Sequence, residues 1–507
     1  MSRAVLQPFE EYQKARVTFV QTVAELATRP QNIDALQSAG VMALLRPLLL
    51  DNVPSIQQSA AIALGRLANY SDDLAEQVVL HDILPQLVLS LAEQNRFYKK
   101  AAAFVLRAVS KHSPELAQKV VESGALEALV TCLEEFDPGV KESASWALGY
   151  IARHNAQLAN EVVEAGAVPL LVLCVQEPEL SLRRISASAL SDISRHSADL
   201  AQKVVDAGAV PHLSQFINNP DPQLKKQVCA CLSQIAKHTV ELAEAVVEAE
   251  IFPRILNCLK DVDMMVRKNA ATCIREIAKQ NPALAKLIVN AGGAAAIVDY
   301  ISEVKGNPRL PGIMTLGYIS AFDESLAMGV IVSKGVPPLK DALEEEPEDH
   351  IKAAAAWALG QIGRHSTDHS RALAEQNIPK LLLAAYIDDQ SSEDLKTKTK
   401  RALKSILQMC VYMPALEPLL EASPSNILKY VVQQISKTLP NDLTARKTFV
   451  QNGGLQKVQE IRAPPGSKLK EYKEAINSLY PPEVIQYYTP EYAQTIMKKV
   501  EEFAQPA

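Results

Sequence analysis

Leucine recurs through this chain of 507 residues at a fixed interval of 42 residues. The series is Leu74, Leu116, Leu158, Leu200, Leu242, Leu284 and Leu326. Self-similarity at a period of this length indicates an array of stacked helical units. One such unit cannot bury its apolar surface alone, so each copy has to be stabilised by stacking on the next. The period therefore predicts a repeat protein with one continuous core.

Three helical segments can be placed in each copy. In the copy that contains Leu158, the first segment stops at Gly166, because glycine readily adopts the left-handed conformation that ends helices. The second segment starts near Pro169, where a missing N–H costs nothing in the first helical turn. The third segment is the longest, as in residues 137–154, and Asp137 is placed to cap it.

This three-helix unit resembles the armadillo repeat, with the HEAT repeat as the alternative. A glycine between the first two helices favours armadillo, and it occurs as Gly124, Gly166, Gly208 and Gly292. The resemblance implies an all-α fold, a right-handed superhelical solenoid of about nine to ten repeats of 42 residues.

Departures from the period divide the chain. Residues 1–28 are expected to form an N-terminal capping helix, and residues 29–410 hold repeats one to nine. Glycine and proline at 302–312 are expected to delay and shorten the third helix of repeat seven and to bend the array there. A degenerate repeat covers 411–462, and residues 463–507 form a Pro/Tyr-rich tail that is either an ordered cap or a docking segment.

Composition narrows the classes of partner and compartment. The formal net charge of −6 argues against general affinity for nucleic acid or for an anionic membrane. The chain shows no signal-peptide core and no apolar run long enough to span a bilayer. Its seven cysteines form no secreted disulfide framework, and Cys132, Cys174 and Cys258 share one second-helix position. We interpret them as core residues of a reducing, cytoplasmic environment.

The search for catalytic and metal motifs favours a non-catalytic protein without a cofactor. No phosphate-binding glycine loop, nucleophile elbow, paired Cys-x-x-Cys or zinc-protease motif occurs. Four histidines are also 42 residues apart, namely His112, His154, His196 and His238. Stacked helices lie roughly 8 to 10 Å apart, whereas zinc ligands come within about 2 Å of the metal, which argues against a metal ladder. We interpret these histidines as cations at the third-helix ends.

The third helices are the alternative site of function, because they line the concave face of an armadillo solenoid. Nuclear-import receptors of the importin-alpha type carry Trp followed four residues later by Asn in successive repeats. This chain lacks the asparagine ladder, which argues against nuclear import. The candidate concave-groove contacts are Phe104, Trp146, Tyr150, Asp192, Gln234, Glu276, Tyr318, Trp357 and Gln361.

Positive charge also repeats, at the beginning of the third helix. The candidate basic interaction ladder comprises Lys99, Lys141, Arg183, Lys225, Arg267 and Arg309. Cations are disfavoured at the positive end of a helix dipole, so something outside the local helix has to compensate them. One interpretation is pairing with an acidic ladder of Glu122, Glu164, Asp206 and Glu248. The other is a free stripe that faces an extended acidic surface and whose binding weakens with salt.

Longer segments carry a more specific resemblance. They read RLANYSDDLAEQVV, AEQNRFYKKAAAFVLRAVSKHSPELAQ, RLPGIMTLGYIS and EEPEDHIKAAAAWALGQIGRHS, together with the YPPEVIQYYTPEY tail. These segments resemble the sperm-associated antigen 6 family, the armadillo proteins of the central apparatus of motile cilia and flagella. The resemblance implies a structural protein of the axonemal central pair, associated with the C1 microtubule and needed for axoneme integrity and flagellar motility.

The expected partners are microtubules, through tubulin, and other central-apparatus proteins, and the expected location is the cytoskeleton of the cilium or flagellum. We hypothesise that the basic ladder meets tubulin or an acidic neighbour, while the groove and tail hold other proteins or a second copy of this chain. The alternative is an armadillo signalling, adhesion or transport adaptor that binds extended peptides in its groove.

Overall fold

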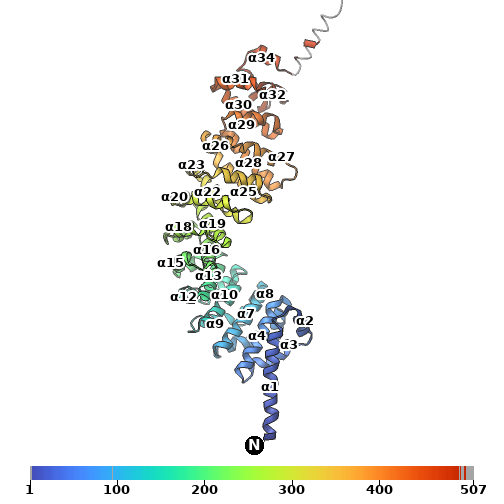
Figure 1. The fold of residues 1–507 in the computed structure, drawn as a ribbon, viewed down its shortest axis with the longest axis vertical. Helices are drawn as coiled ribbons and strands as arrows, with labels where there is room; N and C mark the ends of the chain where they lie inside the picture. The colour runs from blue at the N-terminus through green and yellow to red at the C-terminus, as the bar shows by residue number, and fades with distance from the viewer. Residues whose placement is uncertain (1–2, 94, 490–491, 493–495, 498–507) are drawn as a thin grey trace, which may run out of the picture. The chain divides into compact units, whose positions relative to one another are not determined.

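The computed structural model describes residues 3–93, 95–489, 492 and 496–497. Throughout these residues the regular structure is helical, without a β-strand, which confirms the predicted all-α fold (Figure 1). The chain divides into two compact units, residues 1–277 and 278–507, and each is described by itself.

The first unit begins with an N-terminal helix and one incomplete repeat. These are α1 (Arg3–Leu26), α2 (Pro30–Ser38), α3 (Val41–Leu45), the 3-10 helix η1 (Arg46–Leu50) and α4 (Pro54–Tyr70). The end of α1 packs against α4 and buries Val20, Val23 and Ala24. Phe9 and Tyr12, nearer the start of α1, are exposed.

Five three-helix repeats follow in the first unit. They are α5 (Asp72–Leu80), α6 (Leu84–Glu93) and α7 (Arg96–Ser110); α8 (Pro114–Glu122), α9 (Ala125–Leu133) and α10 (Pro138–Ala152); α11 (Ala156–Glu164), α12 (Ala167–Gln176) and α13 (Leu180–Ser194); α14 (Ala198–Asp206), α15 (Ala209–Gln215), η2 (Phe216–Asn218) and α16 (Pro222–Ala236); and α17 (Val240–Glu248), α18 (Phe252–Cys258) and α19 (Met264–Ala278).

The second unit continues the pattern less regularly. Its elements are α20 (Pro282–Asn290), α21 (Gly293–Glu303), η3 (Asn307–Arg309), α22 (Leu310–Phe322), α23 (Glu324–Val332), α24 (Val336–Glu345), α25 (Asp349–Gly363), α26 (Thr367–Ala374), α27 (Ile378–Ile387), α28 (Glu393–Met409), α29 (Met413–Ala422), α30 (Ser425–Thr438), η4 (Leu439–Asn441), α31 (Leu443–Gln451), α32 (Gly454–Glu460), α33 (Lys468–Asn477) and α34 (Pro482–Tyr487). The third helix α22 has 13 residues where α25 has 15, and η3 precedes it.

A capping side chain precedes each recurring leucine. In seven repeats the residue before the first helix accepts a hydrogen bond from the backbone N–H of the leucine three residues later. These capping residues are Ser71, Ser113, Asn155, Ser197, Thr239, Asn281 and Asp323. The cap satisfies an otherwise unpaired donor of the first turn and thereby sets where each repeat starts.

Three local predictions, on Gly166, Asp137 and the cysteines, are confirmed. Gly166 has a φ of 87°, in the left-handed region, and separates α11 from α12. Asp137 caps α10 by accepting a hydrogen bond of 3.1 Å from the N–H of Val140. All seven cysteines are free and buried, as expected for core residues.

The first part of the tail covers the last repeat. Helix α33 packs against α30, and the Lys473 Nζ donates to the carbonyl oxygen of Gln459 at 2.7 Å. Tyr480 donates to the carbonyl oxygen of Arg446 at 3.1 Å, and burial raises the pKa of Tyr480 to about 12. Residues 490–491, 493–495 and 498–507 of the expected tail lie outside the described residues.

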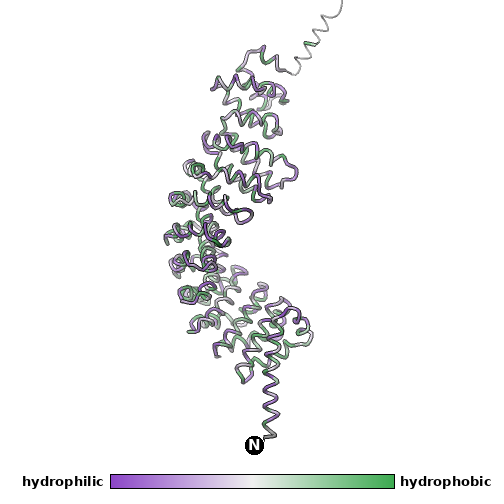
Figure 2. Tube along the Cα trace, in the orientation of Figure 1, coloured by the Kyte–Doolittle hydropathy of each residue, from purple (hydrophilic) through white to green (hydrophobic). Residues whose placement is uncertain are grey.

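Hydrophilic and hydrophobic residues are interspersed along the helices (Figure 2). In the described part of the chain no single helix is long and apolar enough to cross a membrane, although four sharply bent helix pairs meet the criteria of length and composition when each pair is taken together.

Candidate functional site

Third helices of the first unit border an open cleft of about 220 Å³, which we call the third-helix cleft. It lies between α10 and α13 and extends to α16. Its lining residues are Ser145, Trp146, Gly149, Tyr150, Arg153, Ile185, Ser188, Ala189, Asp192 and Gln227. The cleft brings together three of the predicted groove contacts, Trp146, Tyr150 and Asp192.

Small residues allow the two helices that form the cleft to approach closely. A Cβ added to Gly149 would lie 3.2 Å from the Cβ of Ala189 on the next third helix. The large rings of Trp146 and Tyr150 stand on α10, with their centroids 5.9 Å apart, and the short side chain of Ser188 lines the same cleft from α13. This pairing of large with small side chains leaves the space that forms the cleft.

Arginines stack on the aromatic side chains of the cleft. The Arg107 guanidinium lies 4.2 Å from the Trp146 ring centroid and 4.9 Å from that of Phe104. Arg153 lies 5.2 Å from the Tyr150 ring centroid. Burial lowers the pKa of Arg107 from its usual value, since a charged group loses hydration in this position. The Trp146 Nε1 is buried and has no hydrogen-bond partner among the described residues, so the cleft is lined by a residue with an unsatisfied donor.

Asp192 gives the cleft a titratable group. Burial raises the pKa of Asp192 to about 6, although the nearby charges of Arg153 and Arg195 oppose this shift. The Asp192 Oδ1 lies 3.7 Å from the Arg195 Nη1. A hydrogen-bond donor or cation brought by a partner would therefore stabilise the ionised carboxylate.

The remaining predicted groove residues lie elsewhere on the third helices. Phe104 packs beside Gly65 in the first unit, where an added Cβ would come within 2.5 Å of its ring. Gln234 is half-buried and accepts a hydrogen bond of 2.7 Å from Lys237. Glu276 is only 6% exposed and forms an ion pair with Arg275, so its side chain is poorly placed to contact a partner.

In the second unit, Tyr318 and Trp357 form an edge-to-face pair with centroids 5.1 Å apart. Trp357 covers Gly317, where an added Cβ would come within 2.2 Å of the ring. Gln361 is half-buried on the same helix as Trp357. Arg107 was not among the residues predicted from the sequence. Its position four residues before Lys111, at the end of the third helix, is a sequence signal that could have identified it.

The basic ladder has partners within the chain. Lys99, Lys141, Lys225 and Arg309 pair with acids that lie 36 or 37 residues later, at the end of the second helix of the next repeat: Glu135, Glu177, Asp261 and Glu346. Arg183 donates to the carbonyl oxygen of Glu177 and stacks on Phe216, and Arg267 donates to the carbonyl oxygen of Leu259 at 2.8 Å. The four ion pairs and the stacking of Arg183 on Phe216 connect adjacent repeats, whereas the hydrogen bonds of Arg183 and Arg267 lie within their own repeats.

This result differs from both sequence interpretations of the ladder. The expected acidic partners have other contacts: Glu122 pairs with Lys119, Glu164 pairs with Lys203, and Asp206 accepts from Gln202. The side chains of Lys99, Lys141 and Lys225 are no more than 16% exposed. We therefore do not propose the ladder as a binding surface, since its cations already have partners within the chain.

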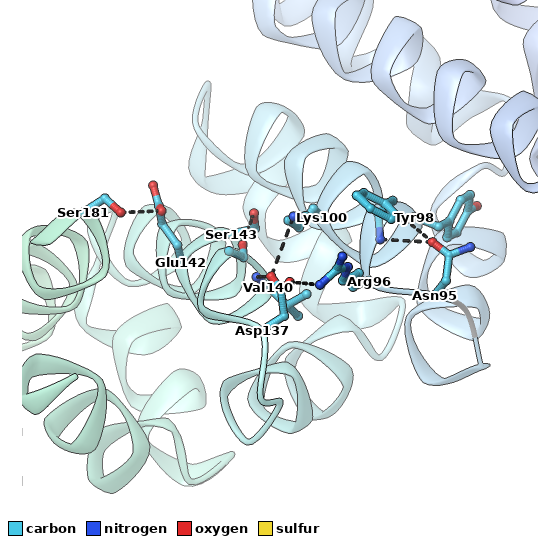
Figure 3. A network of polar contacts seen from close by, with 11 residues as sticks. Asn95, Arg96, Tyr98, Lys100, Asp137, Val140, Glu142, Ser143 and Ser181 are labelled. Carbon is cyan, nitrogen blue, oxygen red and sulfur yellow. Dashed lines mark hydrogen bonds and ion pairs between the residues drawn. The ribbon is translucent and has the colours of Figure 1, made fainter. Parts of the chain in front are cut away.

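A second row of contacts lies beside the first. Arg96 and Lys100 on α7 point toward Asp137, the capping residue of α10, and Ser181 donates to Glu142 at 2.8 Å (Figure 3). Arg184 forms a bidentate ion pair with Asp221, the capping residue of α16. Asp137 and Asp221 thus each cap their own helix and also bind the preceding repeat.

The spaced histidines also connect repeats. The Nε2 of each donates to a carbonyl oxygen at the end of the preceding third helix, at 2.6 to 2.8 Å. The four acceptors are Ala68, Ser110, Ala152 and Ser194. Burial lowers the pKa of His196, which disfavours the cation expected from the sequence. Within the described residues no group of three or more His, Cys, Asp or Glu side chains is placed to hold a metal ion.

Comparisons with known proteins agree with this architecture. The family model described as Armadillo/beta-catenin-like repeat matches residues 113–153, 197–237 and 239–279. A crystal structure of an engineered protein superposes with a TM-score of 0.71 at 25% identity, covering 76% of this chain and 94% of that one. Armadillo repeats generally bind partner proteins or peptides and are typically non-catalytic.

Two curated relatives match along almost the whole chain. Sperm-associated antigen 6 of mouse is 73% identical over 99% of this chain and 99% of its own length. Sperm-associated antigen 6 of human is 73% identical over 99% of this chain and 98% of its own length. The chain therefore belongs to the sperm-associated antigen 6 family of armadillo-repeat proteins.

Proposed function

We propose that the protein is a non-catalytic structural scaffold of the central pair apparatus of motile cilia and flagella, where it binds microtubules and other central-apparatus proteins. The observation that carries the proposal is the 73% identity that extends over 99% of the chain and includes its non-repeating ends. The relatives are named for sperm, which are cells with a motile flagellum.

The contacts between repeats support a mechanical role. Four junctions between repeats of the first unit combine third-helix packing with ion pairs and histidine-to-carbonyl hydrogen bonds, as in Lys141 to Glu177 and His154 to Ser110. Stability in a repeat array is the sum of such neighbour contacts. A scaffold that carries load benefits from junctions of this kind, because each resists separation of adjacent repeats.

The third-helix cleft is the proposed seat for a partner segment. An extended peptide presents carbonyl oxygens to which the unpaired Trp146 Nε1 can donate, and it presents donors that Asp192 can accept. Side chains of the partner would pack on Tyr150 and in the space above Ser188. Affinity at such a site comes mainly from a few aromatic and arginine anchors.

The proposal is tested in flagellated cells that lack the protein and are complemented with tagged versions. The wild-type chain is expected to localise along the central pair by immunoelectron microscopy and to restore motility. Ser188→Trp, which fills the cleft, is expected to reduce both, whereas Phe136→Ala removes a fully exposed ring and serves as the matched control. Intact axonemes in the deleted cells, with the protein at junctions or in nuclei, would instead support an adaptor function.

Direct microtubule contact needs a separate measurement. Purified chain is mixed with microtubules that have or lack their acidic tails, and the pelleted fraction is followed across a salt series. Binding that weakens with salt is expected for contacts between exposed charges. A folded chain that never pellets would show that it reaches the axoneme only through other proteins.

A further inference from the structure

The second unit carries an unusual concentration of positive charge on two neighbouring third helices. Between residues 395 and 416 the sequence contains no acidic residue, although the chain as a whole has a net charge of −6. The cations on α28 and α30, which we call the basic third-helix surface, are Lys396, Lys398, Lys400, Arg401, Lys404, Lys429 and Lys437.

Within its own repeat, α28 carries cations at helix positions equivalent to those that line the third-helix cleft on α10. Arg401 is the ninth residue of α28, as Trp146 is the ninth residue of α10. The glycine contacts support this alignment, because the twelfth residue of α25, Gly360, meets the tenth residue of α28, Ala402. Gly149 and Ala189 hold the equivalent positions in α10 and α13. The face that is aromatic in α10 is therefore basic in α28.

These cations lack the acidic partners that the basic ladder has. Among the described residues, none of the seven forms an ion pair with a carboxylate. The two glutamates of the adjacent helix α29 are engaged elsewhere: Glu421 pairs with Lys457 at 2.7 Å, and Glu417 accepts from Asn452 at 2.9 Å. The remaining acids of α28, Glu393 and Asp394, lie in its first turn, where they stabilise the helix dipole.

Tyrosines take the place of carboxylates. The Lys404 and Lys429 Nζ atoms lie 5.2 and 4.9 Å from the Tyr430 ring centroid, and the Lys400 Nζ lies 5.6 Å from that of Tyr386. Burial alone would raise the pKa of Tyr430, but the hydrogen bonds and charges of Lys404 and Lys429 outweigh it and lower the pKa. Two ammonium groups thus lie over one neutral ring and repel each other. A bound anion would reduce this repulsion.

We propose that the basic third-helix surface binds an extended, acidic polypeptide segment rich in glutamate or aspartate. Adjacent helices lie roughly 8 to 10 Å apart, a span that an extended chain crosses in about three residues. Successive carboxylates of one segment can therefore meet cations on both α28 and α30. This inference goes beyond the proposed function, because it concerns a different unit and a different partner chemistry from the third-helix cleft.

The surface fits an acidic peptide better than it fits a membrane or a nucleic acid. Membrane-surface helices combine cations with large apolar side chains that insert among lipids. In the described residues, neither α28 nor α30 has an exposed large hydrophobic side chain. Single-stranded nucleic acid stacks its bases on open aromatic rings, whereas lysines already lie over Tyr386 and Tyr430.

The test measures binding of a fluorescently labelled oligoglutamate peptide to the full-length chain by anisotropy. Binding is expected at low salt and should weaken as salt screens the exposed charges. Lys398→Glu, Arg401→Glu and Lys404→Glu, combined in one variant, are expected to weaken it by about tenfold or more. The control combines Lys286→Glu, Lys380→Glu and Lys468→Glu, which make the same charge change at exposed sites elsewhere in the second unit, and should bind nearly as wild type.

Circular dichroism establishes that both variants remain helical. If the first variant is misfolded, Lys404→Gln with Lys429→Gln replaces it, because it removes two charges and introduces no repulsion. Equal losses in the test and control variants would overturn the proposal, since they would reflect net charge alone. Unchanged binding in the folded test variant would also overturn it, as would a clear preference of the wild-type surface for phosphatidylserine vesicles or polyuridine over the peptide.

Discussion

Glu250 holds a backbone conformation that suits glycine. Its φ is 52°. It lies between the first and second helices of its repeat, where the preceding repeat has Gly208 with a φ of 78°. Asp82, Lys334 and Asn377 make the same substitution in other repeats. A left-handed conformation costs an L-residue roughly 1 to 2 kcal/mol. These connections between helices therefore carry backbone strain that glycine would remove.

Replacing Glu250 by glycine is therefore expected to raise the free energy of unfolding by about 1 kcal/mol. Urea unfolding of the first unit can be followed by Trp146 fluorescence in a Trp357→Phe background, since the chain has two tryptophans. Gly208→Ala is the matched control and should lower stability by a similar amount. A stability gain in both variants would contradict the explanation.

Asp192 is expected to make the first unit more stable at mildly acidic pH. Its folded pKa is raised to about 6, whereas an unfolded aspartate titrates near 3.9. Between these values the folded state binds the proton more tightly, so this contribution to stability grows as pH falls from about 6 to about 4.

Asp192→Asn should consequently raise the free energy of unfolding by about 1 to 2 kcal/mol at pH 7 and change it little near pH 4. Urea unfolding at both pH values provides the measurement. A larger gain at pH 4 than at pH 7 would show that the carboxylate is stabilised, rather than penalised, by its position between Arg153 and Arg195.

At the scale of elements, one junction in the second unit differs from the others in burial. Arg309 and Glu346 are 3% and 2% exposed, and their side chains lie 3.2 Å apart. Arg309 also donates to the carbonyl oxygen of Pro338 at 2.8 Å, and Glu346 accepts from the N–H of Gly306 at 3.1 Å. The pair joins the shortened third-helix region at η3 to the end of α24.

Arg309→Met is expected to destabilise the second unit by about 3 kcal/mol, because it leaves a buried carboxylate without its charge partner. The double variant Arg309→Met with Glu346→Leu should recover part of this loss, since no buried charge remains. Trp357 fluorescence during urea unfolding reports on this unit in a Trp146→Phe background. A double variant less stable than the single one would contradict the argument.

At the scale of the whole molecule, stability comes from contacts between neighbouring repeats. A destabilising substitution should therefore affect mainly the repeats next to it. Ile476 of α33 is fully buried in the cap of the last repeat. Ile476→Ala is expected to cost about 3 kcal/mol there and to increase hydrogen exchange in α30 to α33. Leu443→Ala, at a site 71% exposed, is the control. Increased exchange throughout the first unit would show cooperativity beyond nearest neighbours.

The sequence by itself determines the 42-residue period, the helix boundaries and several of the connections between helices within a repeat. The physical reason is that Asp137, Gly166 and the recurring leucines act through contacts within a few residues along the chain. Local signals of this kind can be read without knowing how repeats stack. They also predicted that Trp146 and Asp192 share a face.

Only the tertiary structure decided which charges are satisfied. Lys141 meets Glu177 rather than Glu164, and His196 donates to a carbonyl of the preceding helix, because the stacking of repeats sets which residues 36 to 44 positions apart become neighbours. The same stacking buries Glu276, opens the third-helix cleft beside Ser188 and leaves Arg401 without an acid. A periodic sequence specifies equivalent positions, but the offset between stacked repeats determines their contacts.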